Sequence, residues 1–237
     1  MTIALLTAAG RGTRMGQAIP KQFLSVNDKP LLVYTLERFQ KNREIDAIAV
    51  VTLPDWFDEL RGYARQFGID KLKWIVPGGA TGQASIHNGL KALARELDPA
   101  ETVVMIHDGN RPLVSEDVIH DSLAVFKAHG SAIAAIPCVE VAFTSADGCV
   151  ARAEIPRESL WRTQTPHTFR LVSILQACDE AVARGFTGLA AMCQLMAKLG
   201  AVLHFSKGSE KNLKLTTPDD LEIFKALLVA ERSAAGK

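Results

Sequence analysis

Short apolar runs alternate with amphipathic stretches along the chain, and this alternation restricts the possible folds more than any other feature. The apolar runs are rich in β-branched residues and occupy 3–8, 47–53, 73–78, 102–108 and 132–137. Runs that are apolar on both faces are typical of buried parallel strands. The stretches between them carry apolar residues at helical spacing and occupy 30–40, 55–68, 85–97 and 115–130.

Strand and helix therefore alternate four times, which favours right-handed βαβ connections. Gly68 and Gly130 follow two of the expected helices, at positions where a glycine often ends a helix. The pattern predicts an α/β fold: a Rossmann-like, doubly wound, mostly parallel sheet with helices on both faces. In such a fold, ligands bind at the carboxyl ends of the strands.

The alternation breaks between Cys138 and Arg157, where short alternating pieces surround an Asp147-Gly148 turn signal. This pattern predicts a β-ribbon arm at about 138–158 that protrudes from the sheet. Because a two-stranded ribbon is at best marginally stable alone, we expect the arm to pack on a second subunit and form a homodimer.

After the arm, the chain returns through residues 160–169 and continues into two further helical stretches and a strand at 201–206. A last helix begins near Thr217, where Thr-Pro-Asp-Asp reads as an N-cap, a first-turn proline and first-turn acids. No linker or repeat suggests a second folding unit. We therefore expect one domain over residues 1–237.

Charge and composition exclude several classes of protein. The chain has 27 Lys and Arg against 26 Asp and Glu, a formal net charge of +1, so no long-range field attracts a nucleic acid or an anionic membrane. Its apolar stretches fall far short of the ~18 residues of a membrane span. We expect a cytoplasmic protein without nucleic-acid or membrane partners. Cys138, Cys149, Cys178 and Cys193 fit neither zinc spacing nor a compact disulfide scaffold, and we expect them to be reduced.

A loop that combines glycines and cations follows the first strand. Its glycines are Gly10, Gly12 and Gly16, and its cations are Arg11, Arg14 and Lys21. The glycines let the backbone approach an anion closely, but their spacing matches neither a dinucleotide fingerprint nor a Walker loop. The combination at the end of a strand favours a triphosphate site. The alternative is a solvated basic loop, because exposed Arg and Lys are ordinary.

A second group of candidates ends the strand at 102–108. Asp108 closes an apolar run, and a buried carboxylate must be solvated, paired or bound to a metal. Asp108 is thus a candidate partner of Mg²⁺ or of a substrate hydroxyl. Arg111 is either its ion-pair partner or a phosphate clamp, and a purely structural Asp108–Arg111 pair is the alternative. His107 reads as a packed histidine rather than a base.

Five motifs then occur in order. They are AAGRGTRMGxxxPKQF, PGGAxxxxSIxxGL, HDGNRPLV, RESLWRTQTPHTF and KNLKLTTPDDL. Together they resemble the IspD-type cytidylyltransferase family, which includes 2-C-methyl-D-erythritol 4-phosphate and ribitol 5-phosphate cytidylyltransferases. The resemblance covers about residues 3–228. It implies an enzyme that transfers CMP from CTP to a small polyol phosphate and releases pyrophosphate, with Mg²⁺ as cofactor.

The resemblance also implies roles for individual residues. The CTP site would comprise Ala8, Ala9, Gly10, Gly12, Gly79, Ala80 and Ser85, with Arg14, Lys21 and Lys214 as catalytic cations at the phosphates. Asp108 and Arg111 would lie at the reacting centre, with Asp108 as the metal ligand. Arg157 would reach from the partner's arm to clamp the polyol phosphate.

Two departures bear on the acceptor. Methylerythritol enzymes usually read like DTIK where this chain has Glu140, Val141, Ala142 and Phe143, and the usual TD pair appears as Thr187-Gly188. Val141 cannot donate the hydrogen bond that a threonine gives. We expect methylerythritol phosphate as the acceptor, with ribitol 5-phosphate as the alternative. A non-catalytic CTP-binding homologue and a Rossmann dehydrogenase are two further alternatives.

Overall fold

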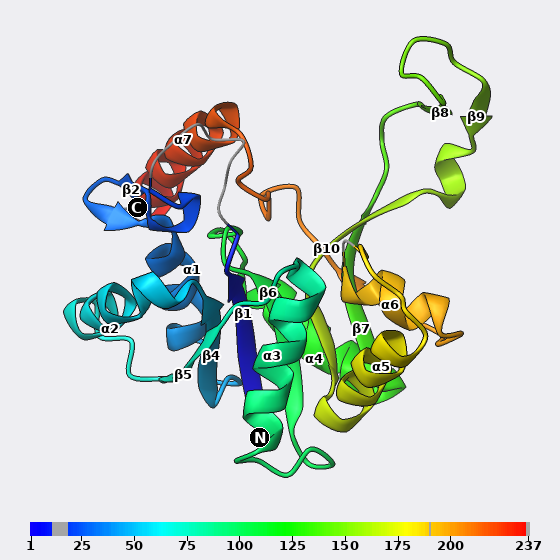
Figure 1. Ribbon diagram of the computed structural model, residues 1–237. Coiled ribbons are helices and arrows are strands. Elements are labelled where there is room, and N and C mark those ends of the chain that lie inside the picture. Colours follow the sequence, from blue (N-terminus) through cyan, green and yellow to red (C-terminus); the bar gives the residue numbers. More distant parts are fainter. Residues whose placement is uncertain (11–18, 190, 236–237) are drawn as a thin grey trace.

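A mixed sheet forms the centre of the computed structural model, which describes residues 1–10, 19–189 and 191–235 (Figure 1). Its strands, in spatial order, are β11 (Phe205–Lys207), β7 (Ser131–Pro137), β10 (Trp161–Arg170), β6 (Val103–Asp108), β1 (Thr2–Ala8), β4 (Ala47–Thr52) and β5 (Leu72–Pro77). Neighbours pair in parallel except at β10, which runs antiparallel to both β6 and β7. The predicted doubly wound, mostly parallel sheet is confirmed.

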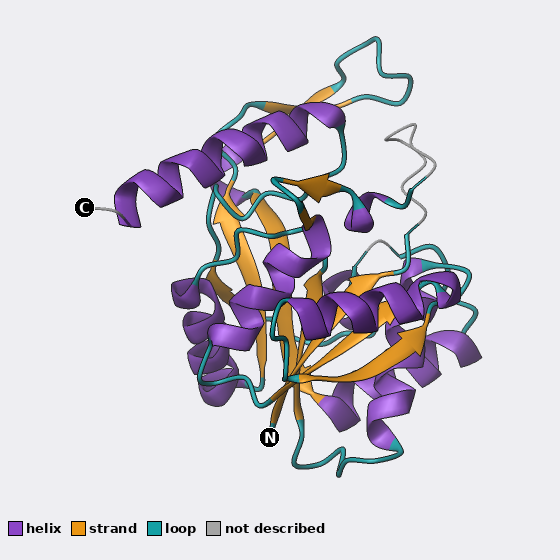
Figure 2. Ribbon diagram, turned by 90° about the vertical axis from the view of Figure 1, so that its left-hand side faces the viewer, coloured by secondary structure: helices purple, strands orange, loops and turns teal. Residues whose placement is uncertain are grey.

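Helices cover both faces of this sheet (Figures 1 and 2). One face carries α3 (Gly82–Ala94), α5 (Leu171–Ala183) and α6 (Met192–Lys198). The opposite face carries α1 (Leu31–Lys41), α2 (Phe57–Gln66) and α4 (Glu116–His129). Every residue of β4 is buried, as its continuous apolar run predicted. Full burial of one such aliphatic side chain contributes about 1.5–3 kcal/mol, so these two cores hold the sheet edge in place.

The C-terminal helix α7 (Pro218–Ala235) packs beside α1 on a third, smaller core that includes Tyr34 and Phe224. The short strands β2 (Ser25–Val26) and β3 (Lys29–Pro30) lie next to it. Thr217 accepts a hydrogen bond from the amide of Asp220 through Oγ1 at 3.3 Å, which confirms the predicted N-cap. Among the described residues, no helix is long and apolar enough to cross a membrane.

Several boundaries agree with the sequence pattern, and two need correction. Gly68 and Gly130 have φ values of +63° and +79°, as glycines that end helices do. The strand expected at 201–206 forms only at Phe205–Lys207. The sequence pattern predicts no strand at 160–169, and this is wrong, because β10 spans Trp161–Arg170. Its polar residues fit there because hydroxyl and amide side chains bond neighbouring loops rather than facing a dry core.

The predicted arm leaves the sheet between β7 and β10 and projects away from the body of the molecule (Figure 1). It contains the short antiparallel strands β8 (Ala142–Thr144) and β9 (Ala153–Ile155). Asp147 Oδ1 accepts hydrogen bonds from the amides of Cys149 and Val150, and Gly148 has a φ of +73°; the Asp147-Gly148 pair thus lies within a longer connection, residues 145–152, instead of forming a tight two-residue turn. That residues 1–237 make one domain stays a prediction.

Candidate active site

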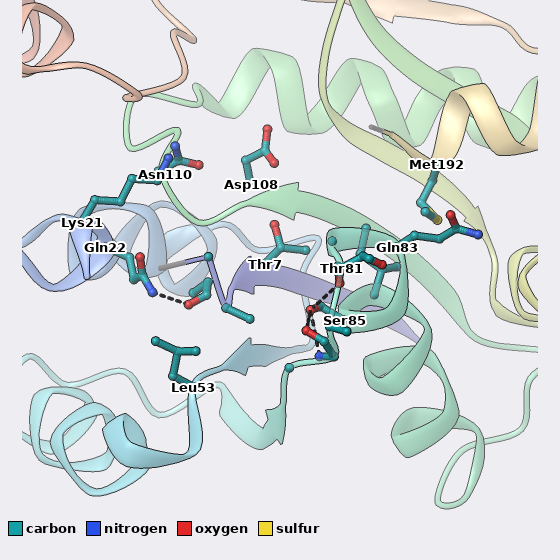
Figure 3. A pocket seen from close by; sticks show the side chains of 18 of the residues that line it. Thr7, Lys21, Gln22, Leu53, Thr81, Gln83, Ser85, Asp108, Asn110 and Met192 are labelled. Atoms are coloured by element: carbon teal, nitrogen blue, oxygen red, sulfur yellow. Dashed lines mark hydrogen bonds between the residues drawn. The ribbon is translucent and has the colours of Figure 1, made fainter. Parts of the chain in front are cut away.

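A cavity of about 700 Å³ lies at the carboxyl ends of β1, β4 and β6 (Figure 3). Nine of the predicted site residues line it: Ala8, Ala9, Gly10, Lys21, Gly79, Ala80, Ser85, Asp108 and Lys214. They come from segments far apart in the sequence, so the fold brings them together at the edge where a parallel sheet is expected to bind ligands. Gly12 and Arg14 fall outside the described residues.

Ala8, Ala9 and Gly10 line this cavity at the end of β1. The carbonyl of Ala8 accepts hydrogen bonds from Gln22 Nε2 at 2.5 Å and from Thr52 Oγ1 at 3.0 Å. Both side chains are buried, so these bonds fix the point where the strand gives way to the loop. Gln22 carries no signal in the sequence, because its role depends on a neighbour fourteen positions away that only the fold reveals.

The N-terminus of α3 also lines the cavity, and Gly78 and Gly79 precede it. A Cβ at Gly79 would stand 2.6 Å from the Cβ of Ala84, and one at Gly78 would stand 2.4 Å from the Cβ of Ala9. Glycine at these positions therefore allows the segment to pack against the helix and the β1 loop at once. Ser85 Oγ accepts a bond from the Gly79 amide at 3.0 Å and donates to the Thr81 carbonyl at 2.9 Å. Its hydroxyl thus shapes the wall of the cavity.

Asp108 is the centre of a charged cluster at the end of β6. Its carboxylate receives Arg111 Nε at 2.9 Å and Lys214 Nζ at 3.1 Å. Burial by itself would raise the pKa of Asp108, but Lys214 and then Arg111 outweigh it and hold the pKa well below its ordinary value. The carboxylate is therefore ionised throughout the neutral range. The predicted Asp108–Arg111 ion pair is present, and Lys214 extends it.

Backbone contacts explain how Lys214 reaches a site built mainly from the first half of the chain. Arg111 Nη1 donates to the Asn212 carbonyl at 2.7 Å, and Asn110 Nδ2 donates to the Leu215 carbonyl at 2.5 Å. Lys21 Nζ donates to that same carbonyl at 3.2 Å. The loop before α7 is thereby held against the ends of β1 and β6, with the ammonium groups of Lys21 and Lys214 on the cavity wall.

His107 is a packed histidine, as the sequence suggested. It is fully buried, stacks edge-on against Phe39, and hydrogen-bonds the Arg111 carbonyl through Nε2 at 3.1 Å. Its Nδ1 lies 3.1 Å from Thr165 Oγ1, which also accepts from the Asp108 amide at 3.0 Å. Burial lowers the pKa of His107 to about 4, so the ring is neutral near pH 7. This chain of bonds holds Asp108 and Arg111 in position.

A metal at Asp108 would need oxygen atoms from outside the protein. In the part of the chain that the structure describes, no group of three or more His, Cys, Asp or Glu side chains could hold a metal ion. Magnesium is commonly held by one or two carboxylates together with substrate phosphates and water. The single carboxylate of Asp108 fits that mode of binding and does not fit a site built from protein ligands alone.

The structure separates Arg157 from the other candidates. It begins the 3-10 turn η4 (Arg157–Ser159) at the base of the arm, where it is exposed. The described residues that line the cavity include none from the arm. Arg157 is therefore not part of the cavity wall of its own chain. The cysteines have no disulfide, as expected: all four are free, and burial raises the pKa of Cys178 to about 12.

Comparison with known proteins identifies the family to which this chain belongs. Residues 2–230 match the family model described as "IspD: 2-C-methyl-D-erythritol 4-phosphate cytidylyltransferase". The chain belongs to the IspD family. This cytidylyltransferase is therefore a CTP-dependent nucleotidyltransferase, and the alternatives of a dehydrogenase and a non-catalytic homologue are set aside.

Named relatives in the family act on two acceptors. A ribitol-5-phosphate cytidylyltransferase of Lacticaseibacillus paracasei is 40% identical over 96% of this chain and 98% of its own. One of Vibrio parahaemolyticus is 41% identical, with 96% of each chain covered. A 2-C-methyl-D-erythritol 4-phosphate cytidylyltransferase of Geotalea uraniireducens is 37% identical over 97% of each chain.

Solved structures agree with the fold. The 4-diphosphocytidyl-2C-methyl-D-erythritol synthase of Anaerococcus prevotii superposes with a TM-score of 0.82 at 25% identity, covering 96% of both chains. The 2-C-methyl-D-erythritol 4-phosphate cytidylyltransferase of Thermus thermophilus gives a TM-score of 0.76 at 28% identity, covering 96% of this chain and 98% of that one. These likenesses support the Rossmann-like assignment made from the strand pattern.

Proposed function

We propose that this cytidylyltransferase is a cytoplasmic enzyme that transfers CMP from CTP to ribitol 5-phosphate and releases pyrophosphate. The observation that carries the proposal is the convergence of the end of β1, Lys21 and Lys214 on one cavity beside Asp108. Ammonium groups aimed at a cavity that is large enough for a nucleotide suit the charge of a triphosphate. The carboxylate of Asp108 balances part of that charge when no ligand is bound.

CTP would lie across this cavity with its phosphates toward the β1 loop and its base toward α3. The main chain around Gly79 and Ala80 lines the cavity and offers polar groups that can read the edge of a pyrimidine. Gln83 extends this wall: its Nε2 donates to the Phe186 carbonyl, and its buried Oε1 has no hydrogen-bond partner in the described part of the chain. An unpaired amide oxygen is suited to accept from an exocyclic amino group.

The reaction would proceed by attack of an acceptor phosphate oxygen on the α-phosphorus of CTP, in line with the departing pyrophosphate. A phosphate oxygen is already anionic near pH 7, so the step needs no general base, which agrees with the neutral, fully bonded ring of His107. Lys21 and Lys214 would stabilise charge that grows on the phosphate oxygens. Arg14 is proposed for the same task and lies outside the described residues.

Magnesium is part of the proposal. Asp108 would hold the ion together with phosphate oxygens of CTP, and the bound ion would neutralise charge on the leaving pyrophosphate. Arg111, with only 11% of its side chain exposed, stays on Asp108 Oδ2 and keeps the carboxylate oriented. Lys214 is 42% exposed, so it can turn from Asp108 Oδ1 toward a phosphate when CTP arrives.

Two observations favour ribitol 5-phosphate as the acceptor. The relatives from L. paracasei and V. parahaemolyticus, at 40% and 41% identity, carry that name, while the methylerythritol relative of G. uraniireducens is 37% identical. The arm also presents Val141 where methylerythritol enzymes usually have a threonine, and this side chain cannot hydrogen-bond a phosphate. Methylerythritol phosphate is the second candidate, because the matching family model bears its name.

The proposed active unit is a homodimer joined through the arm. Four large apolar side chains of the arm are exposed in the single chain: Val139, Val141, Phe143 and Val150. Trp161 and Phe205, at its base, stack with ring centroids 5.3 Å apart and are also largely exposed. A cluster of this kind marks a surface that another protein covers. A second copy would bring the exposed guanidinium of Arg157 to the acceptor phosphate of its partner.

A panel of substrates tests the proposed function. Pyrophosphate release is measured with CTP, ATP and GTP against ribitol 5-phosphate, methylerythritol 4-phosphate and further alditol phosphates. We expect CTP with ribitol 5-phosphate to give the highest kcat/KM. Higher kcat/KM with methylerythritol 4-phosphate would select the second candidate. Equal turnover of ATP and CTP would contradict the proposed reading of the base.

A further inference from the structure

A second, smaller cavity of about 180 Å³ adjoins the nucleotide cavity. The two share lining residues at their border: Thr7, Ile86, Asp108, Met192 and Lys214. Because Asp108 and Lys214 stand on this border, a group at the reacting centre can extend into the smaller space. At ~30 Å³ per water molecule, the cavity has room on the order of six waters, which suits a short hydroxylated carbon chain.

The walls of this smaller cavity are partly apolar and partly hydrogen-bonding. Ile86, Ile106, Ala191 and Met192 supply the apolar part, and Thr163, Gln164, Thr165 and His167 supply the polar part. Most of the polar groups already have protein partners: Gln164 bonds Ser209 in both directions, and Thr165 bonds the Asp108 amide. Nε2 of His167 is the exception.

His167 lies on β10 directly opposite Ile106 of β6, and the residue is only 2% exposed. Its Nε2 is buried and has no hydrogen-bond partner among the residues that the structure describes. The ring also hydrogen-bonds the backbone of Gln164, and this bond raises the pKa of His167, as a bond to a carbonyl oxygen does. Because Nε2 has no partner, Nδ1 is the nitrogen that donates to the Gln164 carbonyl. Since Nδ1 carries the proton of the neutral ring, Nε2 presents a lone pair. A buried acceptor without a donor is costly, which indicates that a donor completes the site.

We propose that His167 Nε2 accepts a hydrogen bond from a hydroxyl of the polyol phosphate acceptor, whose carbon chain occupies the smaller cavity. This inference rests on the proposed function. It makes His167 a specificity-determining residue of the reaction. A hydroxyl is the donor that fits, because the cavity also offers apolar contacts to the C–H groups of a polyol and a route from the reacting centre at Asp108.

Two substitutions separate this role from a purely structural one. In His167→Asn the amide nitrogen replaces Nδ1 and keeps the donor to Gln164, but no acceptor remains at the Nε2 position. In His167→Gln the amide oxygen replaces Nε2 and keeps the acceptor, but the donor to Gln164 is lost. We expect His167→Asn to lower kcat/KM for the polyol phosphate about tenfold or more, with the KM for CTP unchanged, and His167→Gln to retain most of the wild-type value.

Deoxy analogues of the acceptor provide the deciding measurement. A series of ribitol 5-phosphates, each lacking one hydroxyl, is assayed with wild type and with His167→Asn, or the equivalent methylerythritol series if the panel selects that acceptor. We expect one analogue to lose about tenfold in kcat/KM with wild type and to lose nothing further with His167→Asn. Independent losses for every analogue would overturn the proposal, as would wild-type kinetics in His167→Asn.

Thermal denaturation of both variants is recorded alongside. If His167→Gln loses more stability and activity than His167→Asn, the role of His167 is only the structural one of bonding Gln164. That result would overturn the inference. Failure of the proposed function gives a different result, because wild type would then release no pyrophosphate with any polyol phosphate in the panel.

Discussion

The contacts of individual side chains at the ends of β1 and β6 show which residues hold the site together and which line the cavity. Arg111 is nearly buried and bonds both Asp108 and the Asn212 carbonyl, so it holds the site together. Lys21 makes a backbone contact at 3.2 Å to Leu215 and lines the cavity that the nucleotide would fill. Removal of its ammonium group therefore affects phosphate binding more than folding.

Lys21→Ala is expected to abolish most turnover while the thermal midpoint changes little. A cation directed at developing phosphate charge acts mainly in the transition state, and its loss costs on the order of 3 kcal/mol, or about a hundredfold or more in kcat. Lys225→Ala, an exposed lysine of α7, is the matched control and should retain full activity. Wild-type turnover in Lys21→Ala would remove this residue from the reaction.

His107 and His167 also make stability depend on pH. Burial lowers the pKa of each from 6.5 to about 4. Between pH 6.5 and pH 4 the unfolded chain binds protons that the folded chain does not. The contribution of these histidines to the free energy of unfolding is therefore greatest above pH 6.5 and decreases as the pH is lowered toward 4. When the pH is lowered from 7 to 5, each histidine should decrease the free energy of unfolding by about 2 kcal/mol.

Urea unfolding at pH 7 and pH 5 measures this dependence. The loss of unfolding free energy between the two pH values should be smaller in His167→Asn than in wild type by about 2 kcal/mol, because the variant lacks one of the two titrating rings. Equal losses in the two proteins would show that the His167 ring does not stay neutral in the folded state.

At the scale of elements, the N-terminus of α3 is positioned by close packing rather than by a side-chain anchor alone. Gly79 stands against Ala84, and Ser85 ties Gly79 to Thr81. The motif PGGA indicated this segment from the sequence, but the reason for its second glycine appears only in the packing. The backbone here must approach the helix more closely than any other residue allows.

Gly79→Ala is expected to raise the KM for CTP at least several-fold, because the new methyl group would stand 2.6 Å from Ala84 Cβ and 2.9 Å from its carbonyl carbon and displace the base-binding wall. Gly62→Ala in α2 is the control, since a Cβ there meets nothing within 4 Å and an alanine favours the helix. An unchanged KM for CTP in Gly79→Ala would place the base elsewhere.

The sequence predicted the elements whose patterns are local, and it missed those that depend on distant partners. The runs at 3–8 and 47–53 have no polar residue in their interiors that argues against a strand, whereas β10 contains Arg162, Gln164 and His167. Arg162 and Gln164 fit a central strand because a loop from elsewhere bonds them: Glu210 pairs with Arg162 at 2.7 Å, and the Ser209 carbonyl accepts from Gln164.

The residues of the candidate site also fall into two groups: some could be predicted from the sequence, and others are recognised only in the fold. Gly10 and the Asp108–Arg111 pair stand out in the sequence, and the structure places Gly10 and Asp108 on the cavity wall and pairs Asp108 with Arg111. The hydrogen bond from Gln22 to Ala8 and the unpaired Nε2 of His167 depend on which segments the sheet brings together. Periodicity and spacing carry no information about such pairs, so these residues could be recognised only in the folded chain.

For the whole molecule, the arm decides whether the proposed active site is complete within one chain. Arg157 stands at the arm's base, outside the cavity of its own chain. Its planar fork can hold two phosphate oxygens at once, which lysine cannot reproduce. We expect Arg157→Lys to raise the KM for the polyol phosphate far more than that for CTP.

Mixed dimers test the exchange of arms. Arg157→Ala and Lys21→Ala proteins should each be nearly inactive, but subunit exchange between them should restore activity, because a heterodimer then contains one site with both residues intact. Sedimentation or mass measurement confirms that exchange has occurred. No recovery after confirmed exchange would mean that both residues serve the same subunit's site.

The antiparallel strand β10 also imposes an order on folding during synthesis. β7 pairs only with β10 and β11 among the described strands, so residues 131–137 leave the ribosome well before either neighbour exists. The strands β1, β4, β5 and β6 can meanwhile pair with one another. Until residues 161–170 arrive, the nascent chain carries an apolar strand with both edges open, which is the state most exposed to aggregation and to chaperones.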